Sequence, residues 1–169
     1  MRFDVNKFKA TVDSIKQNPE TGIMPFRAKL NWQNDGLLSH VSIRDFEPLI
    51  VDEPFELGGK NRGPNPVEYI ITGAVGCFSL VVIIQADLHG IKINSLETEL
   101  ETSLDMSAFF DAVVGGRHGI GDVTLTLHID TDASKEQLEE IVQYALKYSP
   151  SLNSINVPVR VVIDKRQGS

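Results

Sequence analysis

Cys77 carries the most distinctive chemistry in this chain, because it is the only cysteine among 169 residues. It lies in the run GAVGCFSL, among small and apolar side chains. A thiolate attacks peroxides, whereas a thiol in apolar surroundings acts as a small hydrophobic side chain. The sequence leaves both roles open, and the reactive role requires a neighbouring group that lowers the pKa of the Cys77 thiol.

Helix position alone does not supply that group. Cys77 follows Pro66, the expected first helical residue, by eleven positions, or about 16 Å at about 1.5 Å per residue. The helix dipole acts mainly within the first turn, so a positive charge must come from elsewhere in the chain or from a second copy. The candidates in this chain are Arg27, Arg44, Lys60, Arg62 and Arg117.

The histidines give weaker signals. His118 lies in the glycine-rich run GGRHGIG, which is typical of a solvated loop. The other three, His40, His89 and His128, are scattered and lack metal-ligand spacing. We therefore expect no metal and no cofactor.

Composition narrows the class of protein. A net charge of −7 and a pI near 5.0 argue against nucleic acid or an anionic membrane as partner. One cysteine excludes an intramolecular disulfide, and no apolar leader opens the sequence. We expect a reducing, cytoplasmic compartment.

The segment around Cys77 predicts a central helix. No residue from Tyr69 to Ile84 is charged, and this run is shorter than the roughly 20 residues that span a bilayer. A helix that is apolar on every side must be buried all round. We expect a buried helix that ends at Gly90. Its small residues would allow a second helix to approach, which favours a dimer; they are Gly73, Gly76 and Ser79.

The remaining patterns predict an α+β fold, with an antiparallel sheet and helices packed on one side. A helix around residues 8–15 stops at Asn18-Pro19, and another is predicted at 134–149, where Ser134 and Gln137 form a capping box. Alternation of apolar and polar residues predicts strands at 26–32, 41–43, 49–51, 91–104, 123–129 and 155–163.

The run GPNPVEYIITGAVGCFSL (residues 63–80), followed by Gly90-Ile91 and a long acidic strand, resembles the OsmC/Ohr family of osmotically inducible and organic-hydroperoxide-resistance proteins. The resemblance covers roughly residues 26–164 of a single domain over 1–169, with an N-terminal helical extension at 1–20. It implies an OsmC-like fold and an intertwined homodimer with the two long helices at its centre.

Peroxidase members of that family use two cysteines, helped by a glutamate and an arginine. Cys77 matches the peroxide-attacking cysteine, and Ser149 falls where the resolving cysteine is expected. The glutamate position falls on Val67, with Glu68 one place later, and one place turns a helical side chain by about 100°. The arginine position falls near Asn34, with Arg27 and Arg44 as possible substitutes.

Two functions follow from this resemblance. The first is a peroxidase that reduces organic hydroperoxides through Cys77 and borrows an external thiol, because Ser149 cannot form a disulfide. The second is a non-catalytic homologue that binds a small apolar ligand at the dimer interface. Cys77, Glu68 and Ser149 are the candidate site residues.

Overall fold

A computed structural model describes residues 3–155 and 157–166 of the chain. It divides into two compact units, of which one is Asp4–Ile70 and the other comprises Phe3 and the described chain from Ile71 onward. The predicted N-terminal extension and last strand also include residues 1–2 and 156, which lie outside the described residues. The single domain over 1–169 stays a prediction.

The unit Asp4–Ile70 contains a helix and a three-stranded antiparallel sheet in the order β1-β2-β3. The helix begins where Asp4 accepts a 2.9 Å hydrogen bond from the Lys7 N–H and ends before Pro19, as predicted. The elements are α1 (Val5–Gln17), η1 (Pro19–Gly22), β1 (Lys29–Trp32), β2 (Ser39–Ser42), β3 (Leu49–Val51) and η2 (Phe55–Leu57).

The central helix α2 (Pro66–Leu88) begins at the predicted proline. Its first turn is closed by two reciprocal hydrogen bonds. The Glu68 N–H donates to Asn65 Oδ1 over 2.9 Å, and the Asn65 N–H donates to Glu68 Oε2 over 2.7 Å. The chain leaves the helix through Gly90, whose φ of +72° is the left-handed conformation that glycine adopts readily.

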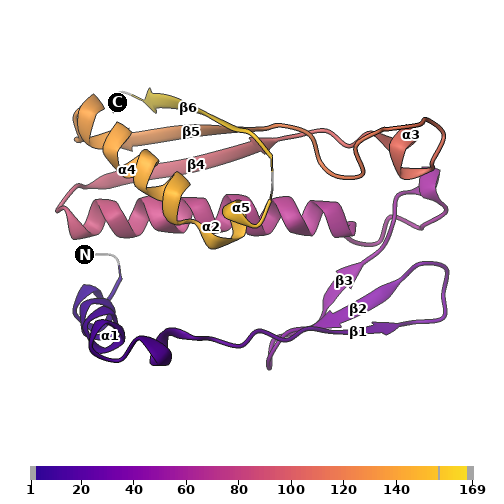
Figure 1. The fold of residues 1–169 in the computed structure, drawn as a ribbon, viewed down its shortest axis with the longest axis horizontal. Helices are drawn as coiled ribbons and strands as arrows, with labels where there is room; N and C mark the ends of the chain where they lie inside the picture. Colours follow the sequence, from indigo (N-terminus) through magenta and orange to yellow (C-terminus); the bar gives the residue numbers. More distant parts are fainter. Residues whose placement is uncertain (1–2, 156, 167–169) are drawn as a thin grey trace. The chain divides into compact units, whose positions relative to one another are not determined.

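The second sheet has the order β4-β5-β6 and lies alongside α2 and α4 (Figure 1). β4 and β5 are antiparallel, whereas β6 runs parallel to β5. The α+β class is confirmed, but a wholly antiparallel sheet was wrong: the helices after β5 carry the chain back, so β6 starts at the same end. The elements are β4 (Ile93–Glu101), α3 (Met106–Phe109), β5 (Val123–Thr131), α4 (Lys135–Tyr148), α5 (Pro150–Asn153) and β6 (Val159–Arg166).

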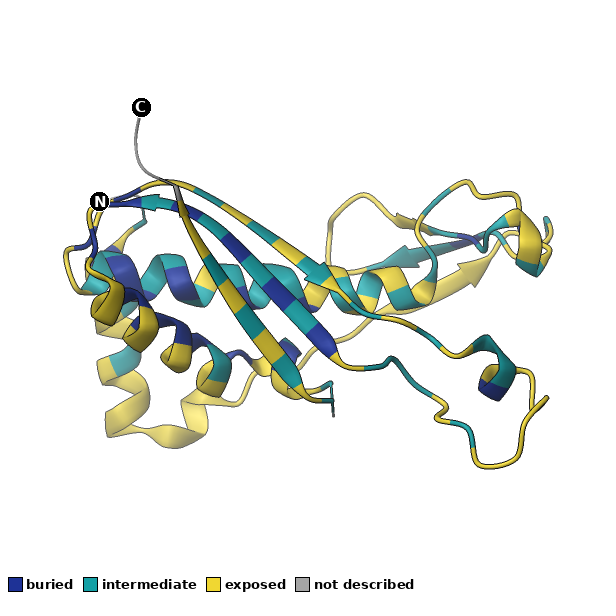
Figure 2. Ribbon diagram, turned by 90° about the horizontal axis from the view of Figure 1, so that it is seen from above, coloured by how far each residue is buried: buried dark blue, intermediate teal, exposed yellow. Residues whose placement is uncertain are grey.

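The core of this second unit lies between one face of its sheet and the two helices. Every second residue of β5 is buried, which appears in Figure 2 as alternating dark blue and teal bands on the middle strand. α2 and α4 each add an apolar stripe with helical spacing. The α2 stripe is Ala74, Phe78, Val82 and Ala86; the α4 stripe is Leu138, Ile141, Val142 and Ala145.

The single chain does not bury α2 on every side, so the expected burial, which called for a second surface from a dimer, stays a prediction. Leu80 is 60% exposed and Ile70 is 51% exposed, and an added Cβ at Gly73 or Gly76 would meet nothing within 4 Å. The helix is 23 residues long, longer than its uncharged run, and by length and composition alone it could cross a membrane. One side of α2 therefore remains uncovered.

Candidate functional site

The cysteine lies on α2 at the edge of the buried stripe. Phe78 and Ala74 beside it are fully buried, whereas Cys77 is a free, half-buried cysteine. The thiol thus stands where the packed core gives way to the uncovered side of the helix, and it is not enclosed by hydrocarbon.

Ser149 reaches the same place from the end of α4. It follows Ala145 by four residues and therefore continues the buried stripe of that helix. Its own N–H donates to the Ala145 carbonyl over 3.0 Å, and Pro150 then begins the short helix α5. Ser149 is completely buried, so the corner between α4 and α5 presents its side chain to the interior.

Asn153 fixes this corner. Its side-chain amide Nδ2 donates to the carbonyl oxygen of Ser149 over 2.8 Å and to that of Leu146 over 3.0 Å. Both main-chain polar groups of Ser149 are therefore occupied. Only its hydroxyl remains to interact with α2.

The surroundings shift the acidity of the thiol in a defined direction. Burial raises the pKa of Cys77, but hydrogen bonding from the Ser149 side chain and from the backbone N–H and hydroxyl of Ser151 outweighs it, so the net pKa is lowered. The structure thus brings Cys77 and Ser149 together. No cationic side chain of the described chain is among the causes.

The Ser149 hydroxyl itself is incompletely satisfied. Its Oγ is buried and has no hydrogen-bond partner in residues 3–155 and 157–166. The neutral thiol leaves this hydroxyl without a hydrogen bond, whereas the Cys77 thiolate would accept one from it, and this preference for the thiolate lowers the Cys77 pKa. A buried polar group left in this state costs on the order of 1–3 kcal/mol, so an anion or an added oxygen at Cys77 would be stabilised there.

Glu68 has a structural role in the first turn of α2. Its carboxylate accepts the Asn65 N–H as half of the reciprocal pair that starts the helix. It precedes Cys77 by nine residues and does not contribute to the shift of the thiol pKa. Glu68 belongs to the unit Asp4–Ile70, whereas Cys77, Ser149 and Ser151 belong to the other unit, and its role as a site residue stays a prediction.

Two of the candidate cations form a separate cluster within Asp4–Ile70, which we call the Asp52 clamp (Asp35, Asp52, Lys60 and Arg62). Asp35 accepts hydrogen bonds from Lys60 over 2.5 Å and from Arg62 Nη1 over 2.6 Å. Buried Asp52 accepts Arg62 Nε over 3.2 Å together with three backbone N–H groups. These cations therefore hold loops together.

The other candidate cations are also placed by the structure. Arg44 stacks over the ring of Phe46 at 4.5 Å, Arg117 pairs with Asp122 at 4.0 Å, and Arg27 is exposed. His118 is exposed, as expected of a solvated loop. No group of three or more His, Cys, Asp or Glu side chains suited to a metal occurs in the part of the chain that the structure describes.

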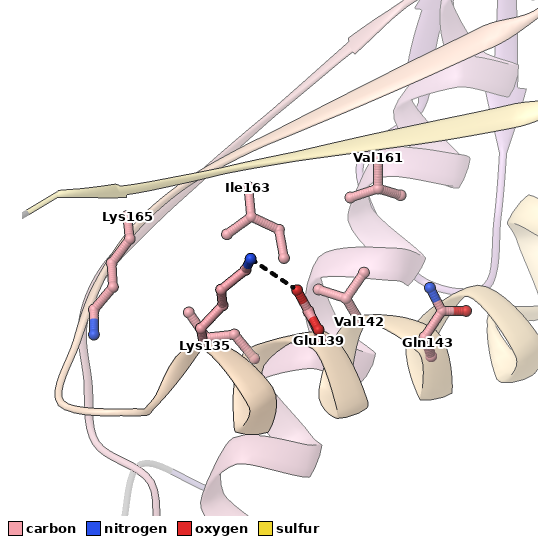
Figure 3. Close-up of a pocket in the computed structure, with 8 residues that line it drawn as sticks. Lys135, Glu139, Val142, Gln143, Val161, Ile163 and Lys165 are labelled. Carbon is pink, nitrogen blue, oxygen red and sulfur yellow. Dashed lines mark ion pairs between the residues drawn. The ribbon is translucent and has the colours of Figure 1, made fainter.

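A groove of about 650 Å³ lies between α4 and β6 (Figure 3). Apolar side chains of both elements line it, and Lys135 and Glu139 form a 3.6 Å ion pair at its rim. Neither Cys77 nor Ser149 lines this groove. We therefore do not assign it to thiol chemistry.

Sequence reasoning missed Ser151 and the Asp52 clamp. Ser151 follows Ser149-Pro150, and a serine directly after a helix-starting proline was the available signal. The clamp joins residues up to 27 positions apart, and no local pattern shows such a pairing.

Comparison with known proteins identifies the fold. The family model described as OsmC-like protein matches residues 59–164. An OsmC-like protein from Mycoplasma pneumoniae superposes with a TM-score of 0.69 at 17% identity, covering 83% of this chain and 97% of that one. No curated protein sequence matches the chain.

Two further solved structures are organic hydroperoxide resistance proteins. The one from Legionella pneumophila has a TM-score of 0.61 at 23% identity, covering 84% of this chain and 98% of that one. The one from Elizabethkingia anophelis has a TM-score of 0.63 at 18% identity, covering 85% and 98%. These likenesses agree in fold with the family match, which spans most of the chain. The chain belongs to the OsmC-like family.

Proposed function

We propose that this protein is a thiol-dependent peroxidase that reduces organic hydroperoxides through Cys77, with an external thiol as reductant. The observation that carries the proposal is the half-buried thiol whose pKa two serines lower against the effect of burial. Two solved proteins of the same fold are organic hydroperoxide resistance proteins. A reducing, cytoplasmic compartment, where thiols are abundant, suits the reaction.

The reaction needs one residue of the chain as nucleophile. The Cys77 thiolate attacks one peroxide oxygen, the S–O bond forms, the O–O bond breaks, and the leaving alkoxide takes a proton to become an alcohol. The sulfenic acid has no second cysteine in the chain to react with. An external thiol displaces water to give a mixed disulfide, and a second thiol releases Cys77.

The test compares the wild type with Cys77→Ser, which removes the only thiol. We expect the wild type to consume tert-butyl hydroperoxide in the presence of dithiothreitol or a dihydrolipoyl donor, and the variant to show the background rate alone. Ser154→Ala is the matched control, because the Ser154 hydroxyl donates to the Pro150 carbonyl at the same corner. Equal, background-level rates for wild type and Cys77→Ser would refute the peroxidase.

The second candidate function is a non-catalytic homologue that binds a small apolar ligand at a dimer interface. Its supporting observation is that the groups of its own compact unit that lower the pKa of the thiol are serines, with Ser149 at the place expected for a resolving cysteine. Native mass spectrometry of the purified protein tests it, and a ligand that stays bound in the Cys77→Ser variant would favour this function.

We also propose that the partner is a second copy of the chain. Leu80 and Ile70 leave one side of α2 uncovered, and an uncovered apolar helix face needs another apolar surface. The small residues Gly73 and Gly76 on α2 would allow close approach of a second helix.

A further inference from the structure

Two other serines, one on α2 and one at the end of α5, already use their hydroxyl groups. The Ser154 hydroxyl donates to the Pro150 carbonyl over 2.9 Å, and the Ser79 hydroxyl lies 2.7 Å from the Val75 carbonyl and 2.8 Å from Thr98 Oγ1. Ser149 differs, because its hydroxyl is wholly buried and has no partner among the described residues. An unused hydroxyl beside a reactive sulfur has the capacity to bind a new atom on that sulfur.

Ser149 cannot turn away to satisfy this hydroxyl elsewhere. Its N–H is held by Ala145 and its carbonyl oxygen accepts from Asn153. Pro150 restricts the following backbone. The side chain is therefore held in place next to α2, with Ser151 one residue beyond the proline.

We propose that Ser149 and Ser151 form a receiving site for the oxygen atom that Cys77 gains on oxidation, so that the sulfenic acid persists until a small external thiol reduces it. The inference rests on the proposed function and adds two positioning residues to it. An organic hydroperoxide supplies the oxygen: the S–O bond forms, the O–O bond breaks, and an alcohol leaves. The external thiol then forms an S–S bond with Cys77 and releases that oxygen as water.

A second oxidation of Cys77 would inactivate the thiol, and the two serines would slow it. A sulfenate reacts with a second hydroperoxide to give a sulfinic acid, which small thiols do not reverse. Hydrogen bonds from the Ser149 hydroxyl and from the Ser151 hydroxyl or N–H would withdraw electron density from the sulfenate and slow this second attack. Ser149 thus protects the single cysteine where a resolving cysteine would otherwise react with it.

The experiment follows the oxidation state of Cys77 in the full chain by intact mass. The reduced wild type, Ser149→Ala, Ser151→Ala and Ser154→Ala proteins receive one equivalent of cumene hydroperoxide and then a second. In the wild type we expect the species with one added oxygen to persist and to return to the thiol with 2-mercaptoethanol. In Ser149→Ala we expect conversion to the species with two added oxygens about three- to tenfold faster, as expected for one lost hydrogen bond.

The controls separate this inference from the proposed function and from misfolding. Ser154→Ala should behave as the wild type, since its hydroxyl serves the Pro150 carbonyl. Ser149→Ala removes an unsatisfied buried hydroxyl, so its melting temperature should equal or exceed that of the wild type. Equal sulfenic acid lifetimes in wild type, Ser149→Ala and Ser151→Ala would overturn the receiving site while leaving the peroxidase intact. A wild type that gains no oxygen would overturn both.

Discussion

The reactivity of this chain depends on the groups that surround the sulfur atom of Cys77. Burial alone would raise the pKa of Cys77 and make the thiol inert. The corner between α4 and α5 reverses that effect through hydrogen bonds from Ser149 and Ser151. Neutral donors therefore do here what a cation does in other reactive thiol sites.

Replacing Ser149 by cysteine tests the contact directly. Because Ser149 lies beside Cys77 and the corner is fixed by Asn153, we expect the Ser149→Cys variant to form an intramolecular disulfide after treatment with hydroperoxide. Mass spectrometry under non-reducing conditions would detect the loss of two hydrogens and a peptide containing both positions.

The matched control is Ser154→Cys, which places a thiol on the same short segment but at an exposed position. We expect no intramolecular disulfide there. Failure of Ser149→Cys to link with Cys77, in a variant that folds, would show that the two side chains are not adjacent.

Cys77 and Ser149 could be proposed as a pair because residues 63–80 resemble the family segment that carries the reactive cysteine, and Ser149-Pro150 falls where that family has its Cys-Pro pair. The role of Ser151 could not, because its contribution depends on how α5 turns toward α2. Glu68 was proposed from its place one residue after the family's glutamate position, and that role stays a prediction. The structure adds that its carboxylate closes the first helical turn.

The Asp52 clamp connects the hairpin turn between β1 and β2 to the loop that precedes α2. Asp52 is 1% exposed, and its pKa is lowered because hydrogen bonds from Arg62 and three backbone N–H groups outweigh the effect of burial. Hydrogen bonds from Lys60 and Arg62 lower the pKa of Asp35. Arg62 thus holds two carboxylates from different loops.

The clamp predicts an acid-sensitive N-terminal unit. A carboxyl whose pKa is lower in the folded state stabilises that state above its unfolded pKa of about 3.9, and the contribution is lost as the pH falls through the folded value. We expect Asp52→Asn to unfold more easily at pH 7 and to lose less stability than the wild type on acidification. Trp32, the only tryptophan, donates to the Gly36 carbonyl in the clamped hairpin, and its fluorescence reports the transition.

Asp13→Asn is the control, since Asp13 is an exposed acid on α1 with only a 3.7 Å contact to Lys16. Its unfolding should follow that of the wild type at every pH. An Asp52→Asn protein that is as stable as the wild type at pH 7 would contradict the clamp.

Most elements follow from local sequence, whereas pairing between distant elements does not. The strand at β5 was predictable because Val123, Leu125, Leu127 and Ile129 alternate with polar residues. The direction of β6 could not be predicted, since the path of the chain through α4 and α5 decides at which end of the sheet β6 begins. Alternation within a strand is the same in parallel and antiparallel sheets.

Each of the two compact units carries exposed apolar side chains on one of its elements. One set lies on the side of α2 that carries Leu80, which is 60% exposed. The other set lies on a face of the sheet β1-β2-β3, where Leu30, Val41 and Leu49 lie opposite one another across the three strands and Leu30 is 58% exposed. Uncovered surfaces of this kind mark interfaces, and a second copy of the chain would supply an apolar surface for each.

The proposed homodimer predicts that a charge placed on the exposed side of α2 weakens association. We expect the wild type to sediment at twice the 18.7 kDa of one chain. Leu80→Lys should weaken association by about a hundredfold to ten-thousandfold, because each dimer loses two buried leucines and each contributes about 1.5–3 kcal/mol. Sedimentation equilibrium over a range of concentrations measures the change in the dissociation constant.

Val114→Lys is the matched control for this variant, since it introduces the same charge at a fully exposed position in the loop between β4 and β5. If α2 forms the interface, Val114→Lys remains a dimer at concentrations where Leu80→Lys is monomeric. A wild type that sediments as a single chain at every concentration would leave α2 uncovered, and the second copy would then be rejected as its partner. A dimer that Leu80→Lys does not weaken would place the interface away from α2, and the close approach through Gly73 and Gly76 would fail with it.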